Sequence, residues 1–222
     1  MSYDPRTIAL LSEIIHPPIE LNPTAIQTIH NQLFGHREFS YQNFAVAPDG
    51  ISLSNATETP GSVSLINFMA DRIQVREELT GAHIDDFCRR IEYLASISLA
   101  ELSMPILATN FHDSREFLSG GVCGLHADAF EPFERPMGLF GMKMIFPVID
   151  GEADFHTLRI ESFNQDPRSV FIENVSTFTS AVMPDHLEEI GASMRRTYDF
   201  LRHKGLSFLA TYDRSEKERG AG

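Results

Sequence analysis

Three helical segments in this chain are separated by runs of several strand-like segments, and this spacing restricts the fold more than any other feature. The helices are expected near residues 23–34, 82–102 and 185–204, where apolar residues recur every three or four positions. Strand-like segments bounded by turn signals such as Asp49-Gly50 fill the intervals. The order β-α-β-β-β-β-α-β, a loop, and then β-β-β-α predicts an α+β fold, with mostly antiparallel sheet packed by about three helices.

The ends of two helices carry local signals. Asn22 followed by Pro23 is a capping side chain before a residue with a preset φ, which predicts the start of the first helix. Asp185 with Glu188 three residues later resembles a capping box, which predicts the start of the last helix. Gly205 is expected to end that helix. A final short strand or coil is then expected at Leu206, Phe208 and Leu209.

Residues 119–137 interrupt the pattern with three glycines and two prolines. This composition predicts a long, mobile loop and the main candidate for a functional surface. The chain is expected to form a single domain over residues 1–212, either undivided or made of two halves, 1–118 and 138–212, joined by this loop. Residues 213–222 are expected to be a frayed tail.

The charge balance restricts the partners. The chain has 18 basic and 31 acidic side chains, so its formal net charge is −13. This charge disfavours nucleic acid as a partner and suits a protein with a basic face. The N-terminal residues do not resemble a signal peptide, and no apolar run reaches the length of a membrane span, so a cytoplasmic protein without a membrane partner is expected. A homodimer or larger homo-oligomer is also expected, because an open sheet has edges that need a partner.

Two candidate chemical sites fall near residues 112–131. Cys123 lies in a glycine-rich segment three residues before His126, and an imidazole can activate a thiol as a nucleophile. His126 could also bind a metal ion together with Asp128 and Glu131, joined by His112 and Asp113. In both cases the alternative is a set of ordinary polar loop residues, and that alternative is the favoured one. No metal or cofactor is therefore expected. Cys88 is expected to pack in the core.

Aromatic residues offer a third possibility. Phe130 and Phe133 lie in the same loop, and the chain has 17 phenylalanines and no tryptophan. These phenylalanines either complete the core or form a protein interface or an apolar ligand cavity. The favoured interpretation of the whole chain is a non-catalytic interaction or assembly protein. The alternatives are a small cysteine- or metal-dependent enzyme and a small-molecule sensor with a phenylalanine-lined cavity.

The order of elements resembles an uncharacterised, sporadically distributed bacterial protein family. At one end the matching piece is the strand Ser-Glu-Ile-Ile-His-Pro-Pro at residues 12–18, followed by the helix from Asn22. At the other end it runs from the His-Leu-Glu-Glu-Ile segment at residues 186–190 to Phe208 and Leu209. The resemblance covers most of the chain in element order. It implies an architecture of long strands closed by an amphipathic helix, and it implies no activity and no catalytic residue.

Overall fold

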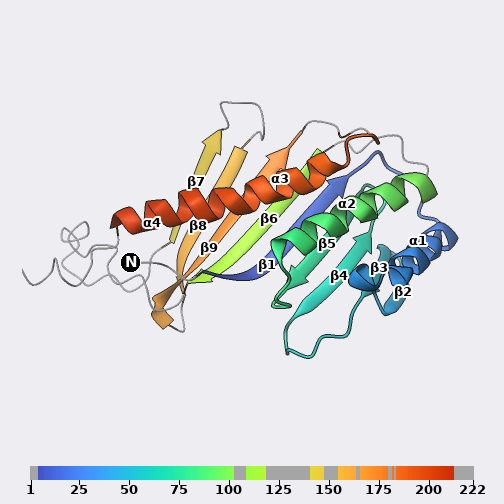
Figure 1. Ribbon diagram of the computed structural model, residues 1–222, viewed down its shortest axis with the longest axis horizontal. Helices are drawn as coiled ribbons and strands as arrows, with labels where there is room; N and C mark the ends of the chain where they lie inside the picture. Colours follow the sequence, from blue (N-terminus) through green and yellow to red (C-terminus); the bar gives the residue numbers. More distant parts are fainter. Residues whose placement is uncertain are drawn as a thin grey trace, which may run out of the picture.

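The computed structural model describes residues 5–102, 109–118, 141–147, 155–163, 166–179, 182 and 184–212. One nine-stranded sheet, with strand order β2-β3-β4-β5-β1-β6-β9-β8-β7, is the central element of this part of the chain. All eight strand pairs are antiparallel, and helices pack on the sheet (Figure 1). The α+β class and the predicted order of strands and helices through α3 are therefore confirmed, whereas the predicted loop at 119–137 lies outside the described residues.

The sheet is built from two halves with the same winding. In the first half, β1 (Arg6–Ile15) is followed by the meander β2 (Asn43–Ala47), β3 (Gly50–Ser54), β4 (Val63–Phe68) and β5 (Arg72–Glu78). In the second half, β6 (Thr109–Leu118) is followed by β7 (Gly141–Pro147), β8 (Phe155–Phe163) and β9 (Asp166–Phe178). The last strand of each meander returns beside the first strand of its half, and β1 and β6 pair at the centre of the sheet.

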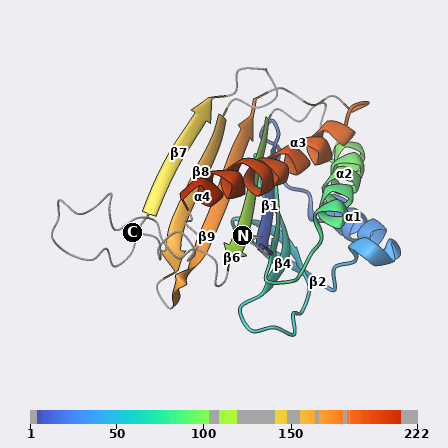
Figure 2. The ribbon, with the colours of Figure 1, turned by 60° about the vertical axis from the view of Figure 1, so that its left-hand side comes forward.

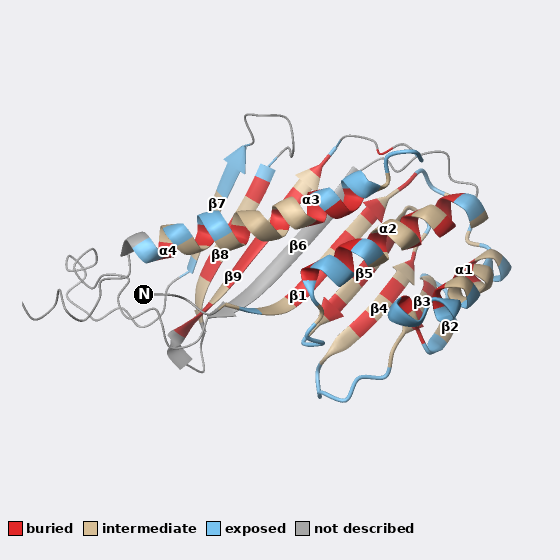
Figure 3. Cartoon of the chain, in the orientation of Figure 1, coloured by how far each residue is buried: buried red, intermediate tan, exposed pale blue. Residues whose placement is uncertain are grey.

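The helices α1 (Pro23–Gly35), α2 (Ile84–Glu101) and α3 (Glu188–Asp199) cover one face of this sheet, as Figures 1 and 2 show. In β4 (Val63–Phe68) and β5 (Arg72–Glu78), buried residues alternate with partly buried ones, so one face of these strands is covered (Figure 3). A short 3₁₀ turn, Arg37–Phe39, connects α1 to β2. None of the helices among the described residues combines the length and apolar character needed to cross a membrane.

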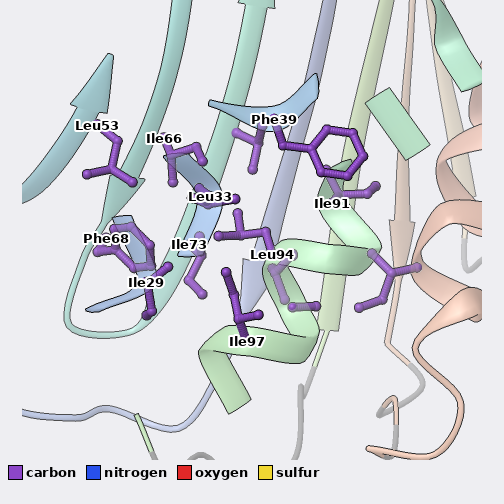
Figure 4. Packing of buried hydrophobic residues seen from close by; sticks show 14 of the residues in the cluster. Ile29, Leu33, Phe39, Leu53, Ile66, Phe68, Ile73, Ile91, Leu94 and Ile97 are labelled. Atoms are coloured by element: carbon purple, nitrogen blue, oxygen red, sulfur yellow. The ribbon is translucent and has the colours of Figure 1, made fainter. Parts of the chain in front are cut away.

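The main core lies between α1, α2 and the first half of the sheet (Figure 4). Ile29 and Leu33 of α1 are fully buried, as are Ile91 and Leu94 of α2. A smaller cluster under the last helix contains Leu158, Ile160, Val170, Ile172, Leu201 and Leu209. The Asn22 cap is confirmed, because its Oδ1 accepts hydrogen bonds from the backbone N–H of Thr24 (2.9 Å) and Ala25 (3.4 Å).

The predicted capping box of the last helix is wrong. The helix begins at Glu188, and Leu187, which precedes it, has helical dihedral angles and makes no capping hydrogen bond with its side chain. The carboxylates of Asp185 and Glu188 instead lie near the imidazole of His186, at 3.7 Å and 3.8 Å. The two acidic side chains therefore lie beside an exposed histidine.

The predicted end of this helix is also wrong. The chain continues from α3 through a π-helical turn, Phe200–Gly205, into α4 (Leu206–Tyr212), and no strand or coil intervenes. Gly205 is buried, and a Cβ atom there would lie 2.9 Å from Ile172 Cδ1 of β9. The glycine is therefore explained by the close approach of the helix to the sheet and not by a helix end.

Candidate functional site

A buried charged cluster connects α2 to the sheet at the end of β5. Glu77 follows Val75 by two residues on that strand, so its side chain points to the same helix-covered face. The side chain of Glu77 is only 4% exposed, and that of Arg90, on α2, is 15% exposed. The two side chains form an ion pair through Arg90 Nη1 and Glu77 Oε1. With Tyr41 and Ser64 they make up what we call the Glu77 cluster.

Hydrogen bonds from three side chains converge on one oxygen of this carboxylate. Ser64 Oγ, on β4, donates to Glu77 Oε1 at 2.8 Å, and the Tyr41 hydroxyl donates to it at 3.4 Å. Arg90 Nη1 donates to Glu77 Oε1 and also to the Tyr41 hydroxyl oxygen, at 3.2 Å. A buried ion pair of this kind is tolerated only when its polar atoms are hydrogen-bonded.

Burial determines the protonation state of the tyrosine. Tyr41 is fully buried. Removal from water raises the pKa of its phenol to about 12, although the nearby guanidinium of Arg90 acts in the opposite direction. The hydroxyl therefore remains protonated over the physiological range and stays a donor to Glu77.

In the described part of the chain, two open hollows of more than 300 Å³ adjoin the Glu77 cluster. The first has a volume of about 470 Å³ and is lined by Glu38, Phe39, Glu77, Thr80, Gly81, Ala82, His83, Asp86, Arg89 and Arg90. The second has a volume of about 330 Å³ and is lined by Asn55, Ala56, Thr57, Glu58, Thr59, Ser62, Ser64, Glu77, Leu79, Thr80 and Arg90. Glu77, Thr80 and Arg90 belong to both linings, so they form a shared wall.

The chain beside this wall adopts an uncommon backbone conformation. Leu79 has φ of 53°, and Gly81 has φ of 73°. A positive φ is ordinary for glycine but costs roughly 1–2 kcal/mol for a leucine. The backbone N–H of Leu79 donates to the carbonyl oxygen of Ile8 at 2.8 Å, which holds the segment against β1. Backbone strain of this kind is concentrated at functional sites in proteins.

Surface ion pairs form the rim of the first hollow. Arg89 on α2 lies 3.4 Å from Glu38 and 2.6 Å from Asp86. All three side chains are more than half exposed, so solvent screens these pairs and each contributes little to stability. The Arg89–Glu38 pair connects α2 to the 3₁₀ turn, whereas the Arg89–Asp86 pair lies within α2.

A second buried polar cluster lies under α3 in the other half of the sheet. His156 Nδ1, on β8, is 2.6 Å from Ser176 Oγ, on β9. The amide nitrogen of Asn174 donates to Ser176 Oγ at 3.2 Å and to the carbonyl oxygen of Thr197 at 2.8 Å. The imidazole of His156 also stacks on the ring of Phe200, with centroids 4.0 Å apart.

The serine and histidine of this second cluster resemble part of a catalytic dyad, but both side chains are buried. Ser176 is fully buried, and His156 is 8% exposed. Burial lowers the pKa of His156 to about 4, so the imidazole is neutral at physiological pH. The His156–Ser176 hydrogen bond joins β8 to β9, and Asn174 connects the cluster to α3 through the carbonyl oxygen of Thr197.

Most residues proposed from the sequence lie outside the described part of the chain. These are Cys123, His126, Asp128, Phe130, Glu131 and Phe133. His112 and Asp113 lie on β6, where the backbone of His112 is in register with Ser12 of β1 and Ser176 of β9. Among the residues that the structure describes, no group of three His, Cys, Asp or Glu side chains could hold a metal ion.

Cys88 is buried on α2, as expected from the sequence, and burial raises the pKa of its thiol to about 12. A thiol with such a pKa is not a nucleophile at neutral pH.

No known family model matches the chain, and no curated protein matches its sequence.

The Glu77 cluster was missed in the sequence for a simple reason. Glu77 and Arg90 are separated by a turn and part of a helix, and each stands beside residues of its own charge, Glu78 and Arg89. The sequence does contain one signal: Glu77 continues the every-second-residue spacing of Ile73 and Val75, which places it on the buried face of the strand. A charged residue on an apolar strand face is seldom buried without a partner.

Proposed function

We propose that the protein is a non-catalytic interaction protein that assembles as a homodimer through the edge of its sheet at β2. The observation that carries this proposal is the composition of that edge. β2 is a terminal strand of the sheet, and its five residues, Asn-Phe-Ala-Val-Ala, include no charged residue and no proline. Natural proteins place charged residues and proline on edge strands to prevent pairing with another chain, and β2 lacks both.

The apolar side chains around β2 support the same proposal. Val46 is 60% exposed, and Phe34, on the neighbouring helix α1, is 61% exposed. His30 links α1 to β2, since its ring lies 6.5 Å from that of Phe34 and 5.8 Å from that of Phe44. An exposed aromatic and an exposed valine lie beside the outer edge of β2, which has no neighbouring strand among the described residues, and a partner strand would cover this surface.

The opposite edge of the sheet contrasts with β2. β7 is the other terminal strand, and it contains Lys143 and Pro147. A lysine and a proline are two of the features by which edge strands resist pairing. The sheet therefore has one edge with these features and one without, which favours β2 for self-association.

A second copy of the chain fits this edge by symmetry. Two identical strands that meet antiparallel across a two-fold axis present donors and acceptors in matching positions, so the contact is self-complementary. The net charge of −13 opposes the approach of two copies, but β2 itself contributes no charge to the contact. The same net charge supports a second candidate, a protein partner with a basic face, bound elsewhere on the acidic surface.

Light scattering of the full chain at tens of micromolar tests the proposal. We expect a mass of twice the 24.9 kDa of one chain for the wild type and for Ile145→Lys, a change on the β7 edge. Val46→Lys places two like charges near the two-fold axis and should give the mass of one chain with unchanged circular dichroism. A monomeric wild type, or a Val46→Lys protein that remains dimeric, would show that the β2 edge is not the interface.

A further inference from the structure

We propose that the two hollows at the Glu77 cluster bind a neutral, hydroxyl-rich small molecule of the saccharide or polyol class. This binding site is separate from the β2 edge and does not depend on dimerisation. The buried charged groups of the site keep hydrogen-bonding atoms that no described residue uses, and the lining of the hollows is polar with an excess of acidic residues. Each of these features restricts the class of ligand.

The guanidinium of Arg90 is only partly used. Among the described residues, its hydrogen bonds to Glu77 and Tyr41 are both made by Nη1. Its Nε atom is buried without an acceptor in that part of the chain. A guanidinium has five N–H donors in a fixed plane and usually binds an oxygen partner through two of them. Its second amino group, Nη2, makes no hydrogen bond to a described residue and is not among the buried atoms. Arg90 lines both hollows, so Nη2 is the donor available there, and the ligand should bring an acceptor oxygen.

The carboxylate of Glu77 complements this arrangement. The bonds donated by Ser64, Tyr41 and Arg90 all arrive at Oε1, so among the described residues Oε2 is the oxygen left for a ligand. Because the Glu77 side chain is 96% buried in the shared wall, a donor that reaches Oε2 would form a charge-assisted hydrogen bond. The ligand should therefore carry donors as well as acceptors, in positions close to one another.

The lining of the second hollow also favours a ligand with both hydrogen-bond donors and acceptors. Two of its members are apolar, Ala56 and Leu79. Six others carry a hydroxyl or amide group, namely Asn55, Thr57, Thr59, Ser62, Ser64 and Thr80. A lining of this composition gives an apolar ligand little favourable contact. Hydroxyl groups on a ligand match it well, since each can both donate and accept.

The charged side chains that line the hollows disfavour both anionic and cationic ligands. Four carboxylates, Glu38, Glu58, Glu77 and Asp86, line the two hollows, against the two guanidinium groups of Arg89 and Arg90. The acidic excess repels anions such as phosphate. A cation would be placed against the guanidinium of Arg90 in the shared wall and would leave its donors without an acceptor. A neutral ligand avoids both penalties.

The dimensions and the backbone agree with a small ligand. The volumes of about 470 Å³ and 330 Å³ lie within the range of small-molecule sites, roughly 300–1,000 Å³. Thr80 stands in the shared wall beside the strained residue Leu79, so the segment that carries strain is also the segment that separates the hollows.

Ligand-observed NMR and calorimetry on the full chain test the proposal, with glucose, maltose and myo-inositol as neutral probes. Phosphate and spermidine serve as the anionic and cationic comparators. Thr80→Val removes a hydroxyl from both hollows and keeps the side-chain shape, without touching the buried ion pair. Thr28→Val, on the exposed side of α1, is the matched control.

We expect saturable binding of at least one neutral probe in the millimolar range by the wild type and the control. Loss of one ligand hydrogen bond should weaken the binding to Thr80→Val about three- to tenfold. Three results would overturn the proposal: no binding of any neutral probe, tighter binding of phosphate or spermidine, or equal binding by Thr80→Val and wild type. The oligomeric mass of Val46→Lys is a separate readout, so failure here and failure of the dimer proposal are distinguishable.

Discussion

Glu77 and Asn174 occupy corresponding places in the two halves of the sheet. Glu77 lies on β5, which flanks β1, and Asn174 lies on β9, which flanks β6. Each is a buried polar residue that binds the helix of its own half, Glu77 through Arg90 of α2 and Asn174 through the carbonyl oxygen of Thr197 of α3. Each half of the sheet thus has a buried polar contact between its last strand and its helix.

The two contacts differ in their access to solvent. Glu77 borders two open hollows, whereas the described neighbours of Asn174 are the buried Ser176, His156 and Thr197. The charged pair therefore adjoins the open site, and the neutral amide is enclosed. This difference follows the cost of burial, because an ionised pair is far more expensive to enclose completely than an amide is.

Removal of Arg90 should destabilise the protein strongly. Arg90→Ala leaves the Glu77 carboxylate buried without its counter-ion, which costs about 3–5 kcal/mol. The neighbouring Arg89 makes only exposed ion pairs, so Arg89→Ala should cost at most about 1 kcal/mol. Urea denaturation followed by circular dichroism measures both values. Equal losses in the two variants would show that the Glu77–Arg90 pair contributes no more than a surface pair.

Replacement of Leu79 should stabilise the protein. Asparagine tolerates the positive φ found there better than leucine does, and Leu79 is 42% exposed, so little packing is lost. We expect Leu79→Asn to raise the free energy of unfolding by about 1 kcal/mol. Leu79→Ala loses the same contacts but keeps the backbone penalty, so it should be no more stable than wild type. A less stable asparagine variant would indicate that the leucine side chain outweighs the strain.

Substitution of Gly205 tests the path of the last helix. The added side chain in Gly205→Val would meet Ile172 and Leu158 at the sheet, and overpacking of this kind costs about 1–3 kcal/mol. Gly35→Ala is the control, because nothing lies within 4 Å of a Cβ atom at that helix end. The alanine should leave stability unchanged or raise it by up to about 1 kcal/mol. Thermal denaturation that shows no loss for Gly205→Val would contradict the close helix–sheet approach.

The sequence predicted the elements whose signals are local. α1 was predicted from the Asn22 cap and the apolar positions Ile26, Ile29 and Leu33, and all three apolar residues are buried. The order of strands along the chain was recognisable from alternation and turn residues. The α+β class followed, because strand runs between helices leave few other arrangements.

The features that the sequence did not reveal depend on contacts between distant segments. A glycine such as Gly205 is typical of a helix end in the sequence. In the structure, the space beside it is filled by Ile172, which is far away in the chain. Glu77 and Arg90 meet only after β5 and α2 have packed together, and Ser64 and Tyr41 reach them from two further segments. The spacing of apolar residues along the sequence indicates which face of an element each residue lies on, but it does not identify the residue that it contacts across the core.

Acidification should destabilise the protein through His156. Burial lowers the pKa of this imidazole to about 4 in the folded state, whereas in the unfolded chain it is near 6.5. Between these values the unfolded chain binds the extra proton, so stability falls as the pH falls from 6.5 toward 4 and is fully present above 6.5. Unfolding by urea at about pH 7 and pH 4.5 should show a loss of roughly 2–3 kcal/mol from this residue. His156→Gln cannot titrate, so its stability should change less over the same interval. Equal losses in wild type and His156→Gln would show that the pKa of the imidazole is the same in the folded and unfolded states, which would contradict its burial beneath the helix.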